Sequence, residues 1–182
     1  MMRFHTWLIP VLVTVGGVAD LTSRFAGPGA PWADDATIVT MLDRFYAGEA
    51  ECSAYALAHA SIPEVKSLAQ KFGQDAQDMR AAEREVAERL RIAPVLRQPS
   101  AVADSHEATL ADLKAMKSPD FDRAFVEHEA TVHQFLLDQL AKAVTGPGPS
   151  PEVKALLDRV TPTIKAHLDL AKTTKQLFKA KA

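Results

Sequence analysis

The chain has 182 residues, of which 47% are apolar and 24% are charged, with a formal net charge of −2. This length suits one domain with a hydrophobic core, and the composition excludes disordered, collagen-like and disulfide-rich classes. The near balance of 21 Lys+Arg against 23 Asp+Glu argues against a nucleic-acid-binding protein, and the single cysteine excludes an intramolecular disulfide and a cysteine-only metal site.

The N-terminus has the pattern of an export signal. Arg3 precedes an apolar run, Trp7–Ala19, which ends in the small residues Gly17-Val18-Ala19. The run is shorter than the roughly 20 apolar residues of a transmembrane helix, and an uncleaved anchor is the less favoured alternative. We predict a cleaved signal peptide at 1–19, a flexible lead-in at 20–33 and a helical domain at 34–182, with the mature protein in the periplasm or another extracytoplasmic space.

The first half of the remaining chain has the pattern of amphipathic helices separated by proline-rich joints. Asp34-Asp35 offers an N-cap for a helix that extends to about His59. Ser61-Ile62-Pro63-Glu64 has the form of a capping box and predicts a second helix, which ends before Pro94. A shorter amphipathic segment lies between Ser105 and Met116.

Two more long helices are predicted in the second half. One begins after Ser118-Pro119, and the Gly146-Pro147-Gly148-Pro149 break separates it from a last helix that starts at Ser150-Pro151. No segment after the signal shows the alternation of a strand. The sequence therefore predicts an all-α fold, an antiparallel four-helix bundle with a short extra helix between its two hairpins.

Polar side chains near the middle of each long helix are the candidates for a functional site. Converging carboxylates and histidines are how helical bundles build metal sites. His133 and His167 lie on apolar helix faces, and Glu129 lies one turn before His133 on the same face. Together with one acid from each of the first two helices, the candidate metal ligands are Glu51, Asp75, His133 and His167, with Glu129 as an additional candidate.

The same residues also fit a structural interpretation. An inward histidine is often a buried polar group that is hydrogen-bonded to a carboxylate. The Glu-x-x-His step of di-iron bundles does not occur in the sequence. His59 and His106 are near helix ends and are predicted at the surface, and Cys52 is predicted as a small core residue rather than a nucleophile. No catalytic residue is predicted.

The order of these features resembles a known bacterial family. The features are a signal peptide, Glu51, and then a set of short segments, namely Pro63-Glu64-Val65-Lys66, Phe121-Asp122-Arg123-Ala124-Phe125 with His133, and Thr161-Pro162 with Ala166-His167-Leu168. They resemble the exported ferritin-like family of domain of unknown function 4142 (DUF4142), over about residues 35–177. The resemblance implies a ferritin-like fold, an extracytoplasmic compartment and Glu51, Asp75, His133 and His167 as site residues. It also implies a second-helix histidine after the aspartate, where this chain has Ala76.

Two functions are open on this basis. The favoured one is a non-catalytic envelope or stress-related protein whose inward Glu and His residues form a structural polar network. The alternative is a ferritin-like protein that binds Fe, Zn or Mn through Glu51, His133 and His167. Neither involves nucleic acid or a transmembrane span in the mature chain, and a peripheral association with the envelope fits both.

Overall fold

Five α-helices make up the part of the chain that the structure describes. The computed structural model describes residues 34–93, 101–117, 120–145 and 148–179. The helices are α2 (Asp35–His59), α3 (Pro63–Leu90), α4 (Ala101–Ala115), α5 (Asp120–Thr145) and α6 (Pro151–Lys179). No strand occurs among the described residues, which confirms the all-α class. The predicted signal peptide and lead-in lie outside this range.

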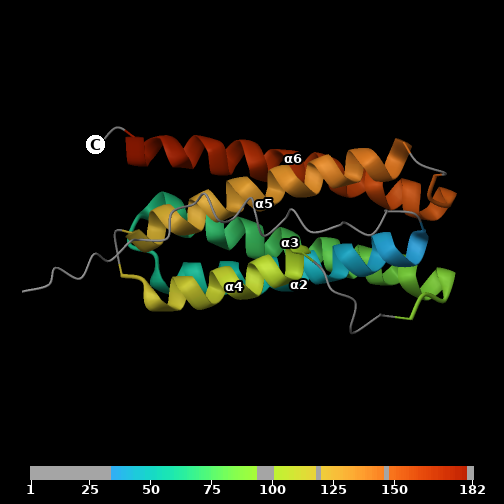
Figure 1. The fold of residues 1–182 in the computed structure, drawn as a ribbon, viewed down its shortest axis with the longest axis horizontal. Helices are drawn as coiled ribbons and strands as arrows, with labels where there is room; N and C mark the ends of the chain where they lie inside the picture. Colours follow the sequence, from blue (N-terminus) through green and yellow to red (C-terminus); the bar gives the residue numbers. More distant parts are fainter. Residues whose placement is uncertain (1–33, 94–100, 118–119, 146–147, 180–182) are drawn as a thin grey trace, which may run out of the picture.

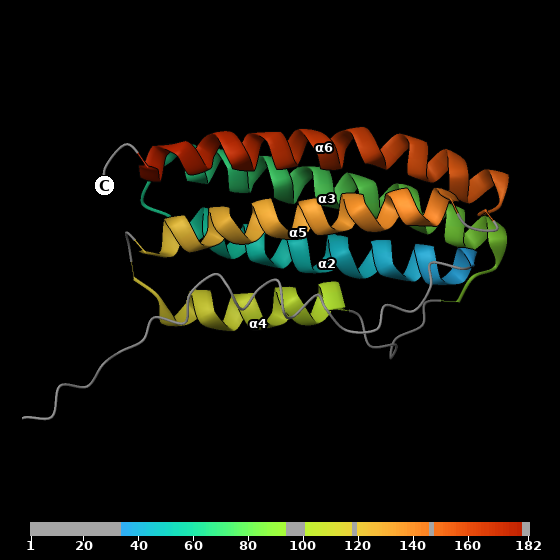
Figure 2. The same cartoon turned by 45° about the horizontal axis from the view of Figure 1, so that its top comes forward.

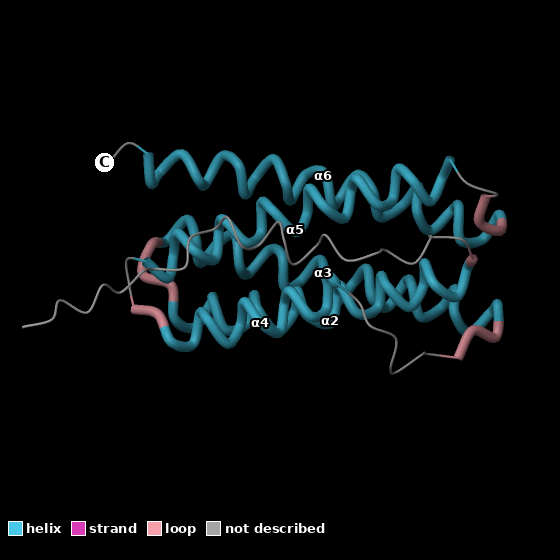
Figure 3. The backbone as a smooth tube through the Cα atoms, viewed as in Figure 1, coloured by secondary structure: helices cyan, strands magenta, loops and turns pink. Residues whose placement is uncertain are grey.

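The helices form an elongated bundle. α2 and α3 run antiparallel as one pair and α5 and α6 as a second, and α3 also packs on α6 (Figure 1, Figure 3). α4 lies along α2 on the side away from α6 and also touches α5 (Figure 2). None of the described helices has a stretch long and apolar enough to cross a bilayer.

At the starts of α2 and α6, polar side chains accept hydrogen bonds from N–H groups of the first helical turn. The Asp34 carboxylate accepts a hydrogen bond from the Thr37 N–H at 2.7 Å, which confirms the predicted N-cap. The Ser150 hydroxyl accepts from the Val153 N–H at 3.3 Å. The Ser150 N–H donates to Asp35 Oδ1 at 2.9 Å, so the first turns of α2 and α6 are joined directly.

The predicted capping box at the start of α3 is wrong. The N-cap is Ile62, and no side chain caps the helix. Ser61 instead donates its N–H to Asp122 Oδ1 of α5 at 3.0 Å and its hydroxyl to Oδ2 of the same residue. Asp122 is fully buried, and a buried carboxylate needs donors, so Ser61 serves α5 rather than its own helix.

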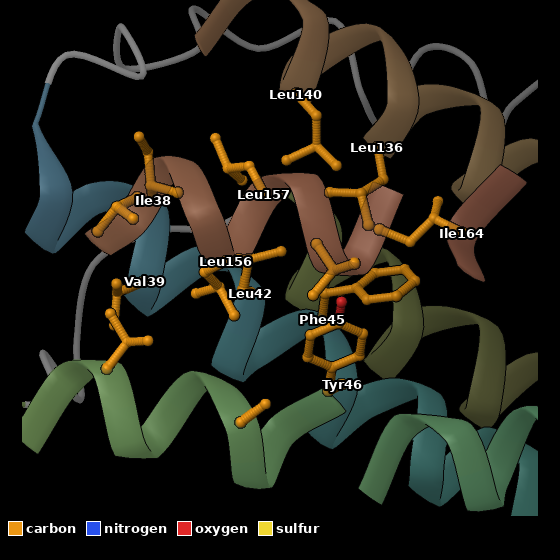
Figure 4. Packing of buried hydrophobic residues seen from close by; sticks show 14 of the residues in the cluster. Ile38, Val39, Leu42, Phe45, Tyr46, Leu136, Leu140, Leu156, Leu157 and Ile164 are labelled. Carbon is orange, nitrogen blue, oxygen red and sulfur yellow. The ribbon is translucent and has the colours of Figure 1, made fainter. Parts of the chain in front are cut away.

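The apolar core consists of two clusters that follow one another along the bundle. The first is built around Leu42, Phe45, Tyr46, Leu136 and Ile164 (Figure 4). The second is built around Cys52, Leu68, Phe72, Phe125 and Ala171. On α2, α5 and α6, buried polar side chains lie where the two clusters meet, namely Glu49, Glu129, His133 and His167. We call these four residues the polar layer.

Candidate metal centre

Three side chains of the polar layer form a compact group of metal-ligand atoms. Glu49 comes from α2, and Glu129 and His133 come from α5, one turn apart. Each residue is at most 1% exposed. One carboxylate oxygen from each Glu and one imidazole nitrogen of His133 lie within 4.8 Å of one another. Two carboxylates and an imidazole, fully buried, form a donor set that transition metals use in proteins.

The hydrogen bond of one His133 nitrogen determines the role of the other. His133 Nδ1 lies 2.8 Å from the backbone carbonyl oxygen of Glu129. Because a carbonyl only accepts, Nδ1 carries the proton of this hydrogen bond. In the neutral ring Nε2 then has a lone pair, 3.9 Å from Glu49 Oε2 and 3.2 Å from His167 Nδ1. The ring is therefore oriented with this lone pair toward Glu49 and α6.

His167 extends the site to α3. Its Nε2 lies 2.7 Å from Asp75 Oδ2, and its ring stacks on Phe72 with the centroids 4.0 Å apart. Asp75 is partly exposed, and the same Oδ2 also lies 2.7 Å from Lys71 Nζ. Asp75 thus links the buried rings to the surface of α3.

The contact between the His133 and His167 rings can exist with or without a proton between them. The outer partners, the Glu129 carbonyl and the ionised Asp75, only accept, so His133 Nδ1 and His167 Nε2 must both carry protons. A hydrogen bond across the 3.2 Å between His133 Nε2 and His167 Nδ1 needs a third proton, which makes the ring pair cationic. If both rings are neutral, two lone pairs face each other instead.

The carboxylate oxygens of the layer have few protein partners. Glu49 Oε1 accepts a hydrogen bond from the Ser53 hydroxyl at 2.9 Å. Glu49 Oε2 and both oxygens of Glu129 accept none within the described part of the chain. Buried carboxylates in native proteins are normally paired or bound to a cation, because an unpaired one is costly.

The two carboxyls and His133 have shifted pKa values. Burial, followed by the nearby Glu49, raises the pKa of Glu129 well above its ordinary value. Burial also tends to raise the pKa of Glu49, but the imidazoles of His106 and His133 outweigh it and hold that pKa below the ordinary value. Burial lowers the pKa of His133 to about 4. Burial thus disfavours the charged forms of Glu129 and His133, whereas the neighbouring imidazoles favour the charged form of Glu49.

α4 adds a further histidine to the edge of the group. His106 is 2% exposed, and its Nε2 lies 3.7 Å from Glu49 Oε2. Gly48 of α2 permits this approach, because a Cβ at that position would lie 2.7 Å from His106 Cβ. His128 of α5 lies beside His106, with ring centroids 5.0 Å apart, and its Nδ1 is 3.1 Å from the Thr109 hydroxyl.

The structure brings together four of the five residues predicted from the sequence. Asp75, Glu129, His133 and His167 are connected by the contacts described above. Glu51 is exposed, so its predicted place in the core is wrong, and Glu49 is the buried acid of α2. Ala76, at the position where the resemblance implies a histidine, is 1% exposed and packs in the first apolar cluster.

Two histidines outside the predicted site and the single cysteine differ in their exposure. His106 is buried, so its predicted surface position is wrong, whereas His59 is exposed as predicted. Cys52 is 1% exposed and lies in the second apolar cluster, as predicted for a core residue. Burial first, and then the carboxylate of Glu129, raises the pKa of its thiol far above the ordinary value.

Another buried acid, Glu83, lies on α3 outside the polar layer. Glu83 is 1% exposed, and neither its Oε2 nor the Tyr46 hydroxyl has a hydrogen-bond partner within the described part of the chain. Burial and then the charge of Asp43 raise the pKa of Glu83 from 4.5 to about 7.

We expect this acid to make stability depend on pH. Between the unfolded value of 4.5 and the folded value of about 7, the folded protein binds more protons at Glu83, so the free energy of unfolding falls as pH rises. Glu83→Gln is neutral throughout and should remove this fall, raising the free energy of unfolding at pH 8 by about 1–2 kcal/mol. Urea denaturation at pH 5 and pH 8 measures it, with exposed Glu85→Gln as the control. If the free energy of unfolding falls by the same amount between pH 5 and pH 8 in Glu83→Gln and in the parent, Glu83 is not the group responsible.

Comparison with known proteins agrees with the helical fold. A family model described as "Domain of unknown function (DUF4142)" matches residues 21–174. A crystal structure of a DUF305 fragment from Deinococcus radiodurans is similar with a TM-score of 0.68 and 17% identity, over 82% of this chain and 98% of that chain. At this identity the likeness concerns the fold alone. No curated protein sequence matches the chain.

Proposed function

The chain belongs to the DUF4142 family, whose description assigns no activity, and from the geometry we propose that it binds a divalent transition-metal ion in its polar layer. The observation that carries the proposal is the set of three buried carboxylate oxygens, Glu49 Oε2 and both of Glu129, that accept no hydrogen bond from the described residues. A cation beside them would remove the cost of burying these oxygens without a partner.

The ligand set follows from the positions of the side chains. Glu49, Glu129 and His133 supply two carboxylates and one imidazole. His167 is the candidate fourth ligand, because its Nδ1 lies 3.2 Å from His133 Nε2. Two imidazoles on one tetrahedral ion, at ~2.0–2.1 Å each, have their nitrogens about 3.3 Å apart. Asp75 would then orient His167 by accepting from its Nε2–H, as carboxylates do behind metal-bound histidines.

The chemistry of the donors selects the class of metal. Imidazole suits Zn, Fe, Cu and Ni, and carboxylate favours harder ions, so a mixed set fits Zn²⁺, Fe²⁺ or Mn²⁺. The donors come from two antiparallel helix pairs, an arrangement that supports a ferritin-like four-helix bundle, α2, α3, α5 and α6, with α4 added at its side.

The second candidate is the structural polar network that the sequence favoured. The opposite pKa shifts of the two carboxyls, upward for Glu129 and downward for Glu49, support it, because a proton held by Glu129 can be shared with Glu49 without any metal. In this case the layer would stabilise the bundle and bind no ion.

Metal analysis separates the two candidates. We expect protein purified without an affinity tag or chelator to contain about one metal ion per chain. After the metal is removed, titration with Zn²⁺, Fe²⁺ or Mn²⁺ should restore about one ion per chain. A protein that binds no ion after such titration would overturn the metal site and leave the polar network.

We also propose that the protein acts outside the cytoplasm as an envelope protein. The apolar run Trp7–Ala19, with its small-residue end, supports export. We expect the exported protein to begin at or near Asp20, which N-terminal sequencing of the periplasmic fraction would establish. Recovery of Met1 on a membrane-bound form would contradict it.

A further inference from the structure

We infer that metal ions reach the polar layer through a cavity between α2 and α4, with His106 as the residue that passes them to Glu49. This inference rests on the proposed metal site and assigns a route to it.

The cavity opens at the surface and ends at buried residues. Its volume is about 540 Å³, and its lining includes Gly48, Glu51 and Cys52 of α2 and His106, Glu107 and Ala111 of α4. Glu51, Glu107 and Ala111 are exposed, whereas Cys52 and His106 are at most 2% exposed. The cavity therefore extends from the solvent to buried residues along the contact between α2 and α4.

His106 connects this cavity to the metal centre. It lines the cavity, and its Nε2 lies 3.7 Å from Glu49 Oε2, an oxygen that accepts no hydrogen bond from the described residues. An imidazole in this place can take an ion that has passed Glu51 and Glu107 and release it to a carboxylate of the centre. Arg44 and Lys114 line the same cavity and balance the charges of Glu51 and Glu107. The route therefore depends on the open volume of the cavity and not on electrostatic attraction of the cation.

The other sides of the layer are less open. Phe45 contacts the rings of His106 and His133 edge-on, with centroids 5.4 Å away in each case, and Phe72 covers His167. On the α3 side, Asp75 is held by both Lys71 and His167 at 2.7 Å, and an ion arriving there would have to displace these bonds. α4, by contrast, packs mainly on one helix, α2.

The test fills the cavity and follows two independent readouts. In Ala111→Trp an indole replaces a methyl group in the lining, and Ala115→Trp, exposed on the same helix outside the lining, is the matched control. The first readout is the association rate of Zn²⁺ with metal-free protein, followed by competition with a chromogenic chelator. The second is the rate at which a small uncharged methanethiosulfonate labels Cys52, the single cysteine of the chain.

We expect Ala111→Trp to slow both processes at least tenfold while the equilibrium affinity for Zn²⁺ changes less than threefold, and Ala115→Trp to change neither rate more than twofold. Gly48→Ala should act in the opposite direction, because the added methyl group meets His106 Cβ at 2.7 Å and forces α4 outward, so Cys52 is labelled several times faster.

The outcomes separate the route from the site. Zn²⁺ that binds Ala111→Trp as fast as the parent would overturn the route and leave the metal site in place, with the Asp75 side as the approach. A parent protein that binds no Zn²⁺, while Cys52 labelling still responds to the filled cavity, would overturn the proposed function and with it the passage of metal.

Discussion

Replacing Glu49 with Gln should weaken Zn²⁺ binding about 100-fold, or about 2.8 kcal/mol. The substitution keeps the size of the side chain and an oxygen for the Ser53 hydroxyl, but it removes the carboxylate of the group whose pKa lies below the ordinary value. In the variant, a bound divalent cation would have one charged ligand fewer, and less of its positive charge would be neutralised in a buried site. Calorimetric titration of metal-free protein measures the change directly.

The matched control lies two residues away on the same helix. Glu51→Gln makes the same chemical change at an exposed position, and we expect its Zn²⁺ affinity to stay within twofold of the parent. Equal affinities of Glu49→Gln and Glu51→Gln would show that the buried carboxylate is not a ligand, whatever the parent protein binds.

Replacing His167 with Ala should lower the free energy of unfolding of the metal-free protein by about 2–4 kcal/mol. The side chain is 4% exposed, stacks on Phe72 and bonds to Asp75 at 2.7 Å. Its removal leaves a cavity beside Phe72 and deprives His133 Nε2 of the group 3.2 Å away. Urea denaturation in the presence of a chelator measures this cost without any contribution from metal binding.

Lys165→Ala, at an exposed position on the same helix, is the control and should change the free energy of unfolding by less than about 0.5 kcal/mol. If His167→Ala and Lys165→Ala have the same free energy of unfolding, the His167 ring is not held in the core. The described contacts of His167 with Phe72, Asp75 and His133 would then be wrong.

The periodicity of the sequence was sufficient to predict the helices and much of the layer. Prolines and small polar residues mark every helix start, and His133 and His167 interrupt apolar stripes in the middle of long helices. The wrong acid on α2 was avoidable, because Phe45, Glu49, Cys52 and Ala56 follow the 4–3–4 spacing of one helix face, and Glu51 does not. Two residues along a helix turn the side chain by about 200°, which is enough to move it from the core to solvent.

The contribution of α4 was harder to predict. A helix start near Ser105 would place His106 at the frayed end of a short helix, where histidines are commonly solvated. The helix begins at Ala101, so His106 lies in its second turn on the face of Leu110 and Leu113. Its burial also depends on Gly48, 58 residues earlier in the chain, and no local pattern reports such a contact between helices.

If Glu49, Glu129 and His133 hold a metal ion, the ion can be located directly by crystallography. The most direct test is a crystal of the metal-free protein soaked in Zn²⁺ and measured at the zinc absorption edge. We expect an anomalous peak inside the polar layer, about 2.0–2.2 Å from a carboxylate oxygen of each Glu and from a nitrogen of His133. Anomalous peaks at surface residues alone, with the polar layer empty, would contradict it.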